Sequence, residues 1–223
     1  MFVNLSTILF CGDLIKIKAS NQGPIYFISF VSTYVLVVVH TKSDWGGLPS
    51  IGTRPLSLPV PYVVIHHTYI PAACYTVADC SAKMRSMQRY HNSLDWGDIG
   101  YHFCVGSEGG AYEGRGWDTE GIHATIANKH SIGICLIGDW RDETPTTEQL
   151  ETTQALIAEG VKLGKISPDY KLIGHNQVSA TECPGGALSA QFSTWDHFAP
   201  GKPTFPSRLP ITPAVPAAEV SSQ

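Results

Sequence analysis

One short segment, Tyr62 to His67, limits the fold of this chain more than any other. It reads Tyr-Val-Val-Ile-His-His, a run centred on β-branched residues without alternation of polar and apolar positions. Such a run is typical of a strand that is buried on both faces of a sheet. Because the strand ends in two histidines, we expect imidazole side chains at the edge of a covered sheet.

Predicted helices and strands alternate along the rest of the chain. The first helix is expected from Thr76 to Tyr90, because Cys80, Met84 and Met87 recur at helical spacing. Thr76 is a suitable N-cap for this helix, since its hydroxyl can accept a hydrogen bond from the first turn.

A second helix is expected to begin with a capping box of Thr146 and Gln149 and to end near Gly164. Its buried stripe consists of Leu150, Ile157 and Val161. The remaining predicted elements are strands at 101–105, 131–137 and 171–174 and a final helix from about Ala187 to Trp195. Strands that alternate with helices predict an α/β fold, in which helices pack on the sheet.

The N-terminal segment has the character of a secretory leader. Lys16 and Lys18 precede an apolar stretch from Ile25 to Val39. This stretch fits the apolar region of a signal peptide and is shorter than the ~20 residues of a membrane-spanning helix. We therefore expect residues 1–34 to be a leader and the protein to be secreted and extracellular. Retention as an anchor and an uncleaved start are the alternatives, and Val35 to Val39 can in addition form the first buried strand.

The C-terminal segment, residues 200–223, is rich in proline and has no hydrophobic period. Proline lacks an N–H donor and fixes φ, so we expect a disordered tail and a folded domain over residues 35–199. The formal charge is −4, from 15 Lys and Arg against 19 Asp and Glu. Without a basic run, this balance argues against a nucleic-acid partner.

Three side chains have the character of zinc ligands. His66 or His67 ends one strand, His175 ends another, and Cys183 follows soon after. Ligands collect at strand ends in open α/β sheets, and two imidazoles with a thiolate form a catalytic zinc set that keeps a position for water. A closed structural site has four ligands, so this set argues against one. Because strand side chains alternate between faces, only one of His66 and His67 is expected to face the metal.

Five segments resemble those of peptidoglycan recognition proteins, which are animal relatives of bacteriophage-type zinc amidases. They are VVIHHT at 63–68, DWGDIGYHF at 95–103, YEGRGW at 112–117, GICLIGDW at 133–140 and GHNQVSATECPGG at 174–186. The likeness follows the family's order from about Val38 to Phe198. It implies a single domain with a mixed central β-sheet flanked by helices, and bacterial peptidoglycan, a muramyl-peptide polymer, as the ligand.

The resemblance also implies roles for particular residues. The Zn²⁺ ligands would be His66, His175 and Cys183, and the catalytic side chains would be Tyr101 and Thr181. The candidates for the substrate groove are His67, Tyr69, Trp96, Tyr112, Arg115 and Trp117. As an alternative, Tyr112, Arg115 and Trp117 pack beneath the groove.

Two cysteine pairs receive different interpretations. The resemblance implies a disulfide between Cys74 and Cys80, which favours an oxidising compartment and hence secretion. Cys104 and Cys135 lie within predicted strands and are expected to be small, buried, apolar residues.

The pair Asp95-Trp96 bears on substrate preference. In the family, Gly-Trp at this place is typical of readers of diaminopimelate-type stem peptides, and Asn-Phe is typical of lysine-type readers. Trp96 therefore favours the diaminopimelate type, whereas the charge of Asp95 would repel the additional carboxylate of that substrate.

The function implied is that of a zinc-dependent N-acetylmuramoyl-L-alanine amidase in innate immunity. It would hydrolyse the amide between the lactyl group of N-acetylmuramic acid and L-alanine, with Tyr101 stabilising the water or the developing oxyanion. The alternative is a non-catalytic peptidoglycan receptor. Cys183 favours the amidase, because receptors of the family commonly have serine there. No stable membrane insertion is expected.

Overall fold

The computed structural model describes residues 37–205, so the expected leader at 1–34, Cys11 and residues 206–223 of the expected tail lie outside the described residues. Within 37–205, no helix has the length and apolar character needed to cross a bilayer. The elements, in chain order, are β1 (Val39–His40), β2 (Val60–His67), α1 (Val77–Ser93), β3 (Phe103–Val105), β4 (Ala111–Glu113), the 3-10 helix η1 (Thr125–Lys129), β5 (Ser131–Leu136), α2 (Thr147–Lys162), β6 (Ile166–Gly174), the 3-10 helix η2 (His175–Gln177) and α3 (Gly186–Phe192).

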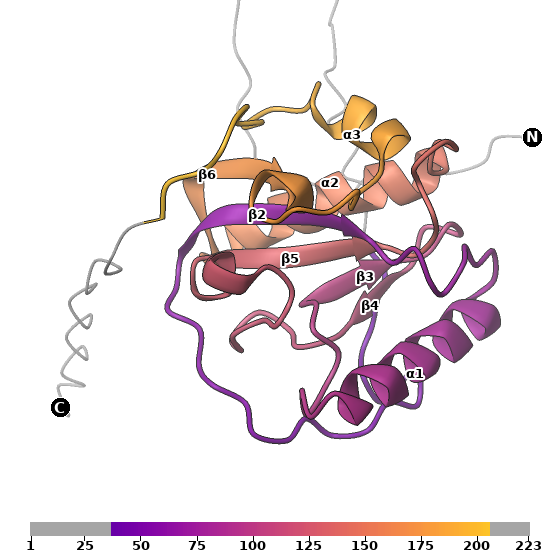
Figure 1. Cartoon of the computed structure of the whole chain (residues 1–223). Helices are drawn as coiled ribbons and strands as arrows, with labels where there is room; N and C mark the ends of the chain where they lie inside the picture. Colours follow the sequence, from indigo (N-terminus) through magenta and orange to yellow (C-terminus); the bar gives the residue numbers. More distant parts are fainter. Residues whose placement is uncertain (1–36, 206–223) are drawn as a thin grey trace, which may run out of the picture. The chain divides into compact units, whose positions relative to one another are not determined.

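The strands form one sheet in the order β1-β4-β3-β5-β2-β6, and Figure 1 shows β4, β3, β5, β2 and β6 in this sequence. β3 and β4 are antiparallel, and the other neighbouring pairs are parallel. The predicted α/β fold with a mixed central sheet is therefore confirmed. The predicted buried strand at Tyr62 to His67 is β2, which lies between β5 and β6 and is buried along nearly its whole length.

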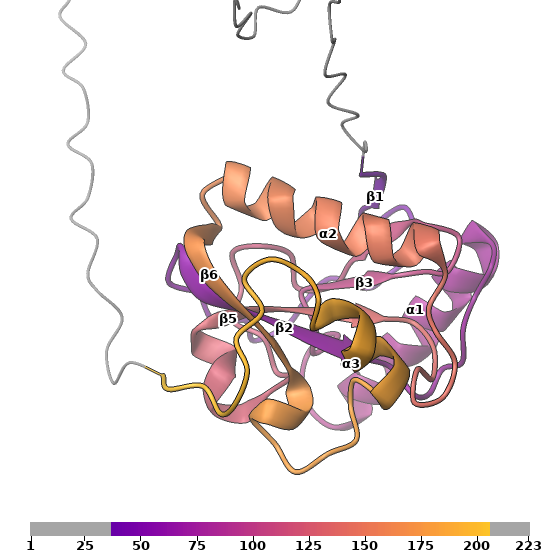
Figure 2. The ribbon, with the colours of Figure 1, turned by 90° about the horizontal axis from the view of Figure 1, so that it is seen from above.

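The two faces of the sheet are covered by different helices. Val63 and Ile65 of β2 point to the face where α2 packs with Leu156 and Ile157, and Figure 2 shows α2 lying along the strands. On the other face, Met84 of α1 belongs to a second cluster. This cluster also contains Cys104 of β3, Cys135 of β5 and Tyr112 of β4. On this same face, Tyr62 and Val64 of β2 pack in a third cluster with Ala124 and Ala127.

Both predicted helix starts are confirmed. The hydroxyl of Thr76 accepts a hydrogen bond from Asp79 N, and that of Thr146 accepts one from Gln149 N. Gly164 follows the second helix with φ +66, a conformation that favours glycine. The capping box is only half formed, because the Gln149 amide donates instead to the carbonyls of Val105 and Ile137 and so attaches α2 to the sheet.

Two expectations about strands were wrong, and one strand was not predicted. The first strand is not a buried one at Val35 to Val39: β1 covers only Val39–His40 at the sheet edge, and Val38 is 55% exposed. β6 begins at Ile166 rather than Lys171, because an edge strand tolerates the proline at 168. β4 was not predicted, since three residues after a Gly-Gly pair carry too little pattern.

The expected tail begins later than residue 200. The Tyr62 hydroxyl donates a hydrogen bond to the Thr204 carbonyl at 2.8 Å. The Phe205 ring packs against the rings of Tyr62 and His130, with centroids 5.0 and 5.7 Å apart. These contacts fix residues 204 and 205 to the rest of the domain, beyond its predicted end.

Four cysteines form two disulfides within the described residues. The Cys74–Cys80 bond implied by the resemblance is present. Cys104 and Cys135 are buried as expected, but they are bonded to each other rather than separate. They are direct register partners on β3 and β5 and point to the same face, a relation that appears only once the strands are paired.

Candidate metal centre

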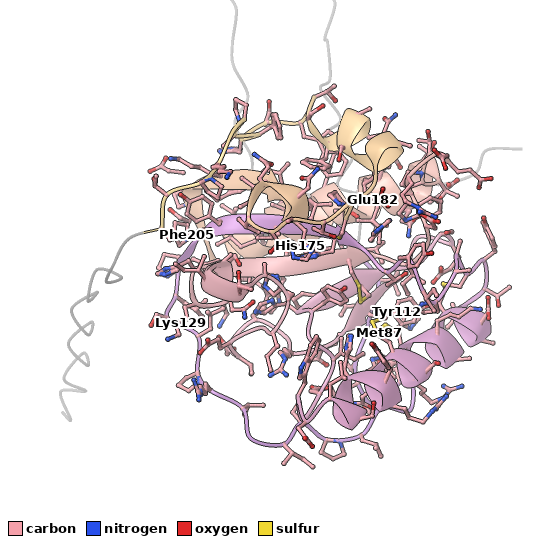
Figure 3. The ribbon with its side chains drawn as sticks, viewed as in Figure 1. Met87, Tyr112, Lys129, His175, Glu182 and Phe205 are labelled. Carbon is pink, nitrogen blue, oxygen red and sulfur yellow. A yellow bond between two sulfur atoms is a disulfide. The ribbon has the colours of Figure 1, made fainter. Side chains whose placement is uncertain are left out.

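The pairing of β2 with β6 brings two histidines to one edge of the sheet. Ile65 is the register partner of Gly174 in this parallel pair, so His66 and His175 follow at the same level. His66 points to the α1 side of the sheet and is fully buried. His175 is the first residue of η2, and Figure 3 shows it beside β2. The ring centroids of the two histidines lie 4.5 Å apart.

Cys183 completes the cluster from the loop between η2 and α3. Its Sγ lies 3.7 Å from His66 Nδ1 and 3.4 Å from the backbone N of His67, which donates to it. The loop is fixed to the segment after β5, because Ala187 N donates to the Arg141 carbonyl and Leu188 N to the Trp140 carbonyl. One ligand atom from each of His66, His175 and Cys183 lies within 4.8 Å of the others.

These three side chains fit a zinc ion. In a tetrahedral zinc site, nitrogen and sulfur ligands lie about 3.5 Å from one another, given bond lengths near 2.0 and 2.3 Å. The 3.7 Å between His66 Nδ1 and Cys183 Sγ is close to this value. Burial lowers the pKa of His66 and His175, so both imidazoles are neutral and able to bind a metal. Burial raises the pKa of the Cys183 thiol to about 12, so metal binding must displace its proton.

Tyr101 lies between the metal ligands and a pocket. Its ring centroid is 5.0 Å from that of His66 and 5.9 Å from that of His91. Burial raises the pKa of its phenol, which therefore stays protonated and able to donate a hydrogen bond. Thr181 is exposed, and its hydroxyl accepts a hydrogen bond from Cys183 N at 3.2 Å. Thr181 thus contacts the loop that carries the cysteine.

Two pockets lie near Tyr101, and none of the three ligands lines either of them. The first pocket has a volume of about 600 Å³ and is lined by the predicted groove residues Trp96 and Arg115. The second pocket has a volume of about 510 Å³ and is lined by Tyr101, His91 and the predicted groove residue Tyr69. The His91 ring stacks on Trp96 at 4.6 Å and so joins the two pockets.

Arg115 lines the first pocket while its guanidinium is fixed by the backbone. It donates to the carbonyls of Ile99, Trp96 and Glu120. Asp95, at φ +61, lines the same pocket. Arg115, a predicted groove residue, is therefore held in place beside Trp96.

Three predicted groove residues line neither pocket. His67 is buried on the opposite face from His66 and accepts a hydrogen bond from Trp140 N. Trp117 packs on Phe103, with centroids 4.4 Å apart, on the α2 side. Tyr112 is fully buried, and its hydroxyl donates to Glu108. For Trp117 and Tyr112, the alternative of packing in the core describes what the structure shows.

The sequence prediction did not include three buried histidines near the site. His91 continues the buried stripe of α1 one turn after Met87, one residue beyond the predicted end of that helix, so a longer helical window would have found it. His102 and His123 lie behind His66, with ring centroids 5.4 Å apart. His123 sits in the loop before η1 and carries no periodic or motif signal.

We expect acid to unfold the metal-free protein through these histidines. Burial lowers the pKa of His102 to about 3, whereas an unfolded histidine titrates near 6.5. Below pH 6.5 the unfolded chain binds this proton and the folded chain does not, so stability falls by about 1.4 kcal/mol per pH unit for this group, or about 2 kcal/mol at pH 5. The free energy of unfolding is measured with urea between pH 6.5 and 5, with a chelator present. It should fall less steeply with falling pH in His102→Asn, by the equivalent of one bound proton. Equal slopes in both proteins would contradict the assignment.

Comparisons with known proteins agree with this geometry. Residues 56–186 match the family model Amidase_2, described as N-acetylmuramoyl-L-alanine amidase. The chain is 49% identical over 159 residues to peptidoglycan-recognition protein LB of Drosophila melanogaster, which covers 71% of this chain and 68% of that protein. It is 43% identical over 164 residues to the N-acetylmuramoyl-L-alanine amidase of Mus musculus, across 72% of this chain. The chain spans only 31% of the length of that mouse enzyme.

Solved structures show the same fold. Wild-type Drosophila PGRP-LB matches with a TM-score of 0.72 and 47% identity, over 74% of this chain and 97% of that one. A tyrosine-to-phenylalanine mutant of Drosophila PGRP-LB, in complex with tracheal cytotoxin, matches with a TM-score of 0.71 and 48% identity, over 72% of this chain and 96% of that one.

Proposed function

Because the chain belongs to the peptidoglycan-recognition protein family, we propose that it is a zinc-dependent N-acetylmuramoyl-L-alanine amidase that binds and hydrolyses bacterial peptidoglycan in innate immunity. One observation carries the proposal: His66, His175 and Cys183 present their ligand atoms within 4.8 Å of one another, beside a pocket that Tyr101 lines. Three protein ligands leave a coordination position open, which is typical of catalytic rather than structural zinc.

Each residue of the site has a separate role in the proposed amide hydrolysis. His66, His175 and Cys183 would hold the metal, which would act as a Lewis acid toward the amide carbonyl and would lower the pKa of water to about 7. Tyr101 keeps its proton because burial raises the pKa of its phenol. It donates a hydrogen bond to the oxygen on which negative charge develops. Thr181 stabilises the loop that carries Cys183, because its hydroxyl accepts a hydrogen bond from Cys183 N.

The two pockets receive the stem peptide and its sugar. Three solved relatives are described in complex with tracheal cytotoxin, and the description of one of them identifies this ligand as monomeric diaminopimelic acid-type peptidoglycan. The first pocket offers Arg54 and Arg115 for a carboxylate and Glu120 for an ammonium group. We therefore assign the diaminopimelate-type stem peptide as the preferred substrate, with Trp96 as the wall of this pocket.

Asp95→Gly tests this preference. The substitution removes a negative charge from the first pocket, and glycine adopts the φ of +61 more readily than aspartate. Affinity for a diaminopimelate-type muropeptide should rise about two- to fivefold, which corresponds to one exposed charge contact. Affinity for the lysine-type muropeptide, measured in the same titration calorimetry series, should stay the same. A similar rise for both ligands would mean that Asp95 does not discriminate between them.

The domain limits and the destination of the protein are part of the proposal. The amidase domain covers residues 35–205, because Thr204 and Phe205 contact the sheet; a leader at 1–34 that directs secretion precedes it, and a proline-rich tail follows it. The disulfides Cys74–Cys80 and Cys104–Cys135 support secretion, because such bonds persist in oxidising compartments.

The competing function is that of a receptor that binds muramyl peptides without cleaving them. Mass spectrometry of a diaminopimelate-type muropeptide incubated with the protein separates the two functions. The amidase releases the free stem peptide with an L-alanine amino terminus, loses this activity in chelator and regains it with zinc. A receptor returns the muropeptide intact in every arm, and that result would overturn the proposed activity.

A further inference from the structure

We infer that His123 is a positioning residue for the metal centre, because its imidazole fixes which nitrogen of His66 faces the metal. The inference rests on the proposed zinc site and concerns a residue outside its three ligands. It begins from one contact: His66 Nε2 and His123 Nδ1 lie 3.0 Å apart, with the two rings nearly perpendicular at 87°.

The two nitrogens of His66 have separate partners. Nδ1 lies on the side of the Cys183 sulfur, at 3.7 Å, and Nε2 contacts His123. Within residues 37–205, His66 Nε2 has no other hydrogen-bond partner. Neither a carboxylate nor a backbone carbonyl, the usual partners of a metal-bound histidine, takes this place.

This arrangement determines the tautomer. A neutral imidazole carries one ring proton, and the nitrogen that binds a metal must be unprotonated. With Nδ1 of His66 toward the ligands, the proton is on Nε2 and is donated to His123 Nδ1. His123 must then carry its own proton on Nε2, so its Nδ1 remains a permanent acceptor.

The fold holds the His123 ring in this position from both sides. Asn128 Oδ1 accepts hydrogen bonds from the backbone N of His123 and of Ala124. A Cβ on Gly133 would lie 2.7 Å from three atoms of the His123 ring, and one on Gly121 would lie 2.4 Å from its Cδ2. Two glycines therefore make room for the ring.

Gly133 is informative because it lies in the middle of β5, where every residue is buried. Glycine weakens a strand interior, since it has no side chain to pack. In addition, the Nε2 atoms of His102 and His123 are buried without a protein partner among the described residues. Such a cluster lowers stability compared with apolar packing, so its presence behind His66 points to a functional role.

The test compares His123→Asn with His123→Leu. The two side chains have nearly the same shape and fit the same space beside Gly133, but only asparagine offers an acceptor for His66 Nε2. Zinc affinity is measured by competition with a chromophoric chelator. Loss of a partner of this kind lowers metal affinity by 10–100-fold, and we expect a loss of about that size in His123→Leu. His123→Asn should stay within about threefold of the unaltered protein.

A second readout does not depend on affinity. With Co²⁺ in place of zinc, the visible absorption bands should shift in His123→Leu and stay unchanged in His123→Asn. His130→Asn is the control, because His130 is also buried but stacks on Phe205. It should bind zinc like the unaltered protein.

The outcomes separate the inference from the proposed function. Equal zinc affinities in the leucine and asparagine variants, with native circular dichroism in both, would overturn the role of His123. The proposed metal centre would be unaffected by this result. Failure of the unaltered protein to bind zinc would instead overturn the metal centre itself. If His123→Leu does not fold, a loss of affinity of about 10-fold or more in folded His123→Asn also contradicts the inference.

Discussion

Replacing Cys183 with alanine is expected to abolish amide hydrolysis and to leave binding to insoluble peptidoglycan intact. The substitution removes the thiolate, so only His66 and His175 remain to hold the metal. The pockets that would bind the substrate are lined by none of the three ligands. Turnover of muropeptide should fall to the uncatalysed rate, and the protein should still sediment with peptidoglycan.

Glu182→Gln is the matched control for this experiment. Glu182 precedes the cysteine in the same loop, is 80% exposed and pairs with Arg141 at 3.4 Å (Figure 3). Its replacement should keep turnover within about twofold, because an exposed ion pair contributes little. Loss of peptidoglycan binding in Cys183→Ala, with an unchanged circular dichroism spectrum, would show that the metal centre and the binding pockets are not separate.

Tyr101→Phe is expected to lower turnover by about 10²–10³-fold, the effect of removing one hydrogen-bond donor from a developing oxyanion. The phenol stays protonated because its burial raises its pKa, and phenylalanine keeps the packing against His66 and His91. Zinc stoichiometry should not change, since the tyrosine is not one of the three ligands.

The measurement is the initial rate of stem-peptide release at saturating zinc, with zinc content determined on the same sample. Tyr170→Phe is the control, because that ring stacks on His197 away from the pockets. A rate in Tyr101→Phe within twofold of the unaltered protein would remove Tyr101 from the catalytic step, whatever its distance from His66.

Local signals in the sequence predicted much of the fold. Thr76 and Thr146 mark the starts of α1 and α2 because N-capping is a short-range interaction, and both caps are formed. The β-branched run of β2 predicted the strand that carries His66, since burial on both faces leaves a continuous apolar run. Alternation of strands and helices was enough for the class of fold.

Relations between distant segments could not be predicted in the same way. The Cys104–Cys135 bond depends on the register of β3 with β5, which no local pattern encodes. Trp117 follows Arg115 by two residues, yet it packs with Phe103 on the opposite face while Arg115 lines a pocket. An aromatic residue near a groove motif is therefore not enough evidence for a groove contact.

The candidate site likewise contains residues that the sequence could predict and one that it could not. One of His66 and His67, together with His175 and Cys183, could be singled out in the sequence because their residue types and positions at strand ends suit zinc, and the family resemblance implied His66 as the ligand. Nothing in the sequence singles out His123, whose importance comes only from its 3.0 Å contact with His66 and the space above Gly133. A residue that acts through another residue has no chemical pattern of its own in the sequence.

The most direct test of the central claim is to titrate metal-free protein with zinc and to follow hydrolysis of diaminopimelate-type muropeptide at each step. We predict that the rate rises in proportion to bound zinc and becomes constant at one equivalent. Zinc bound at one equivalent without any release of stem peptide would contradict the account, and would identify the centre formed by His66, His175 and Cys183 as inert.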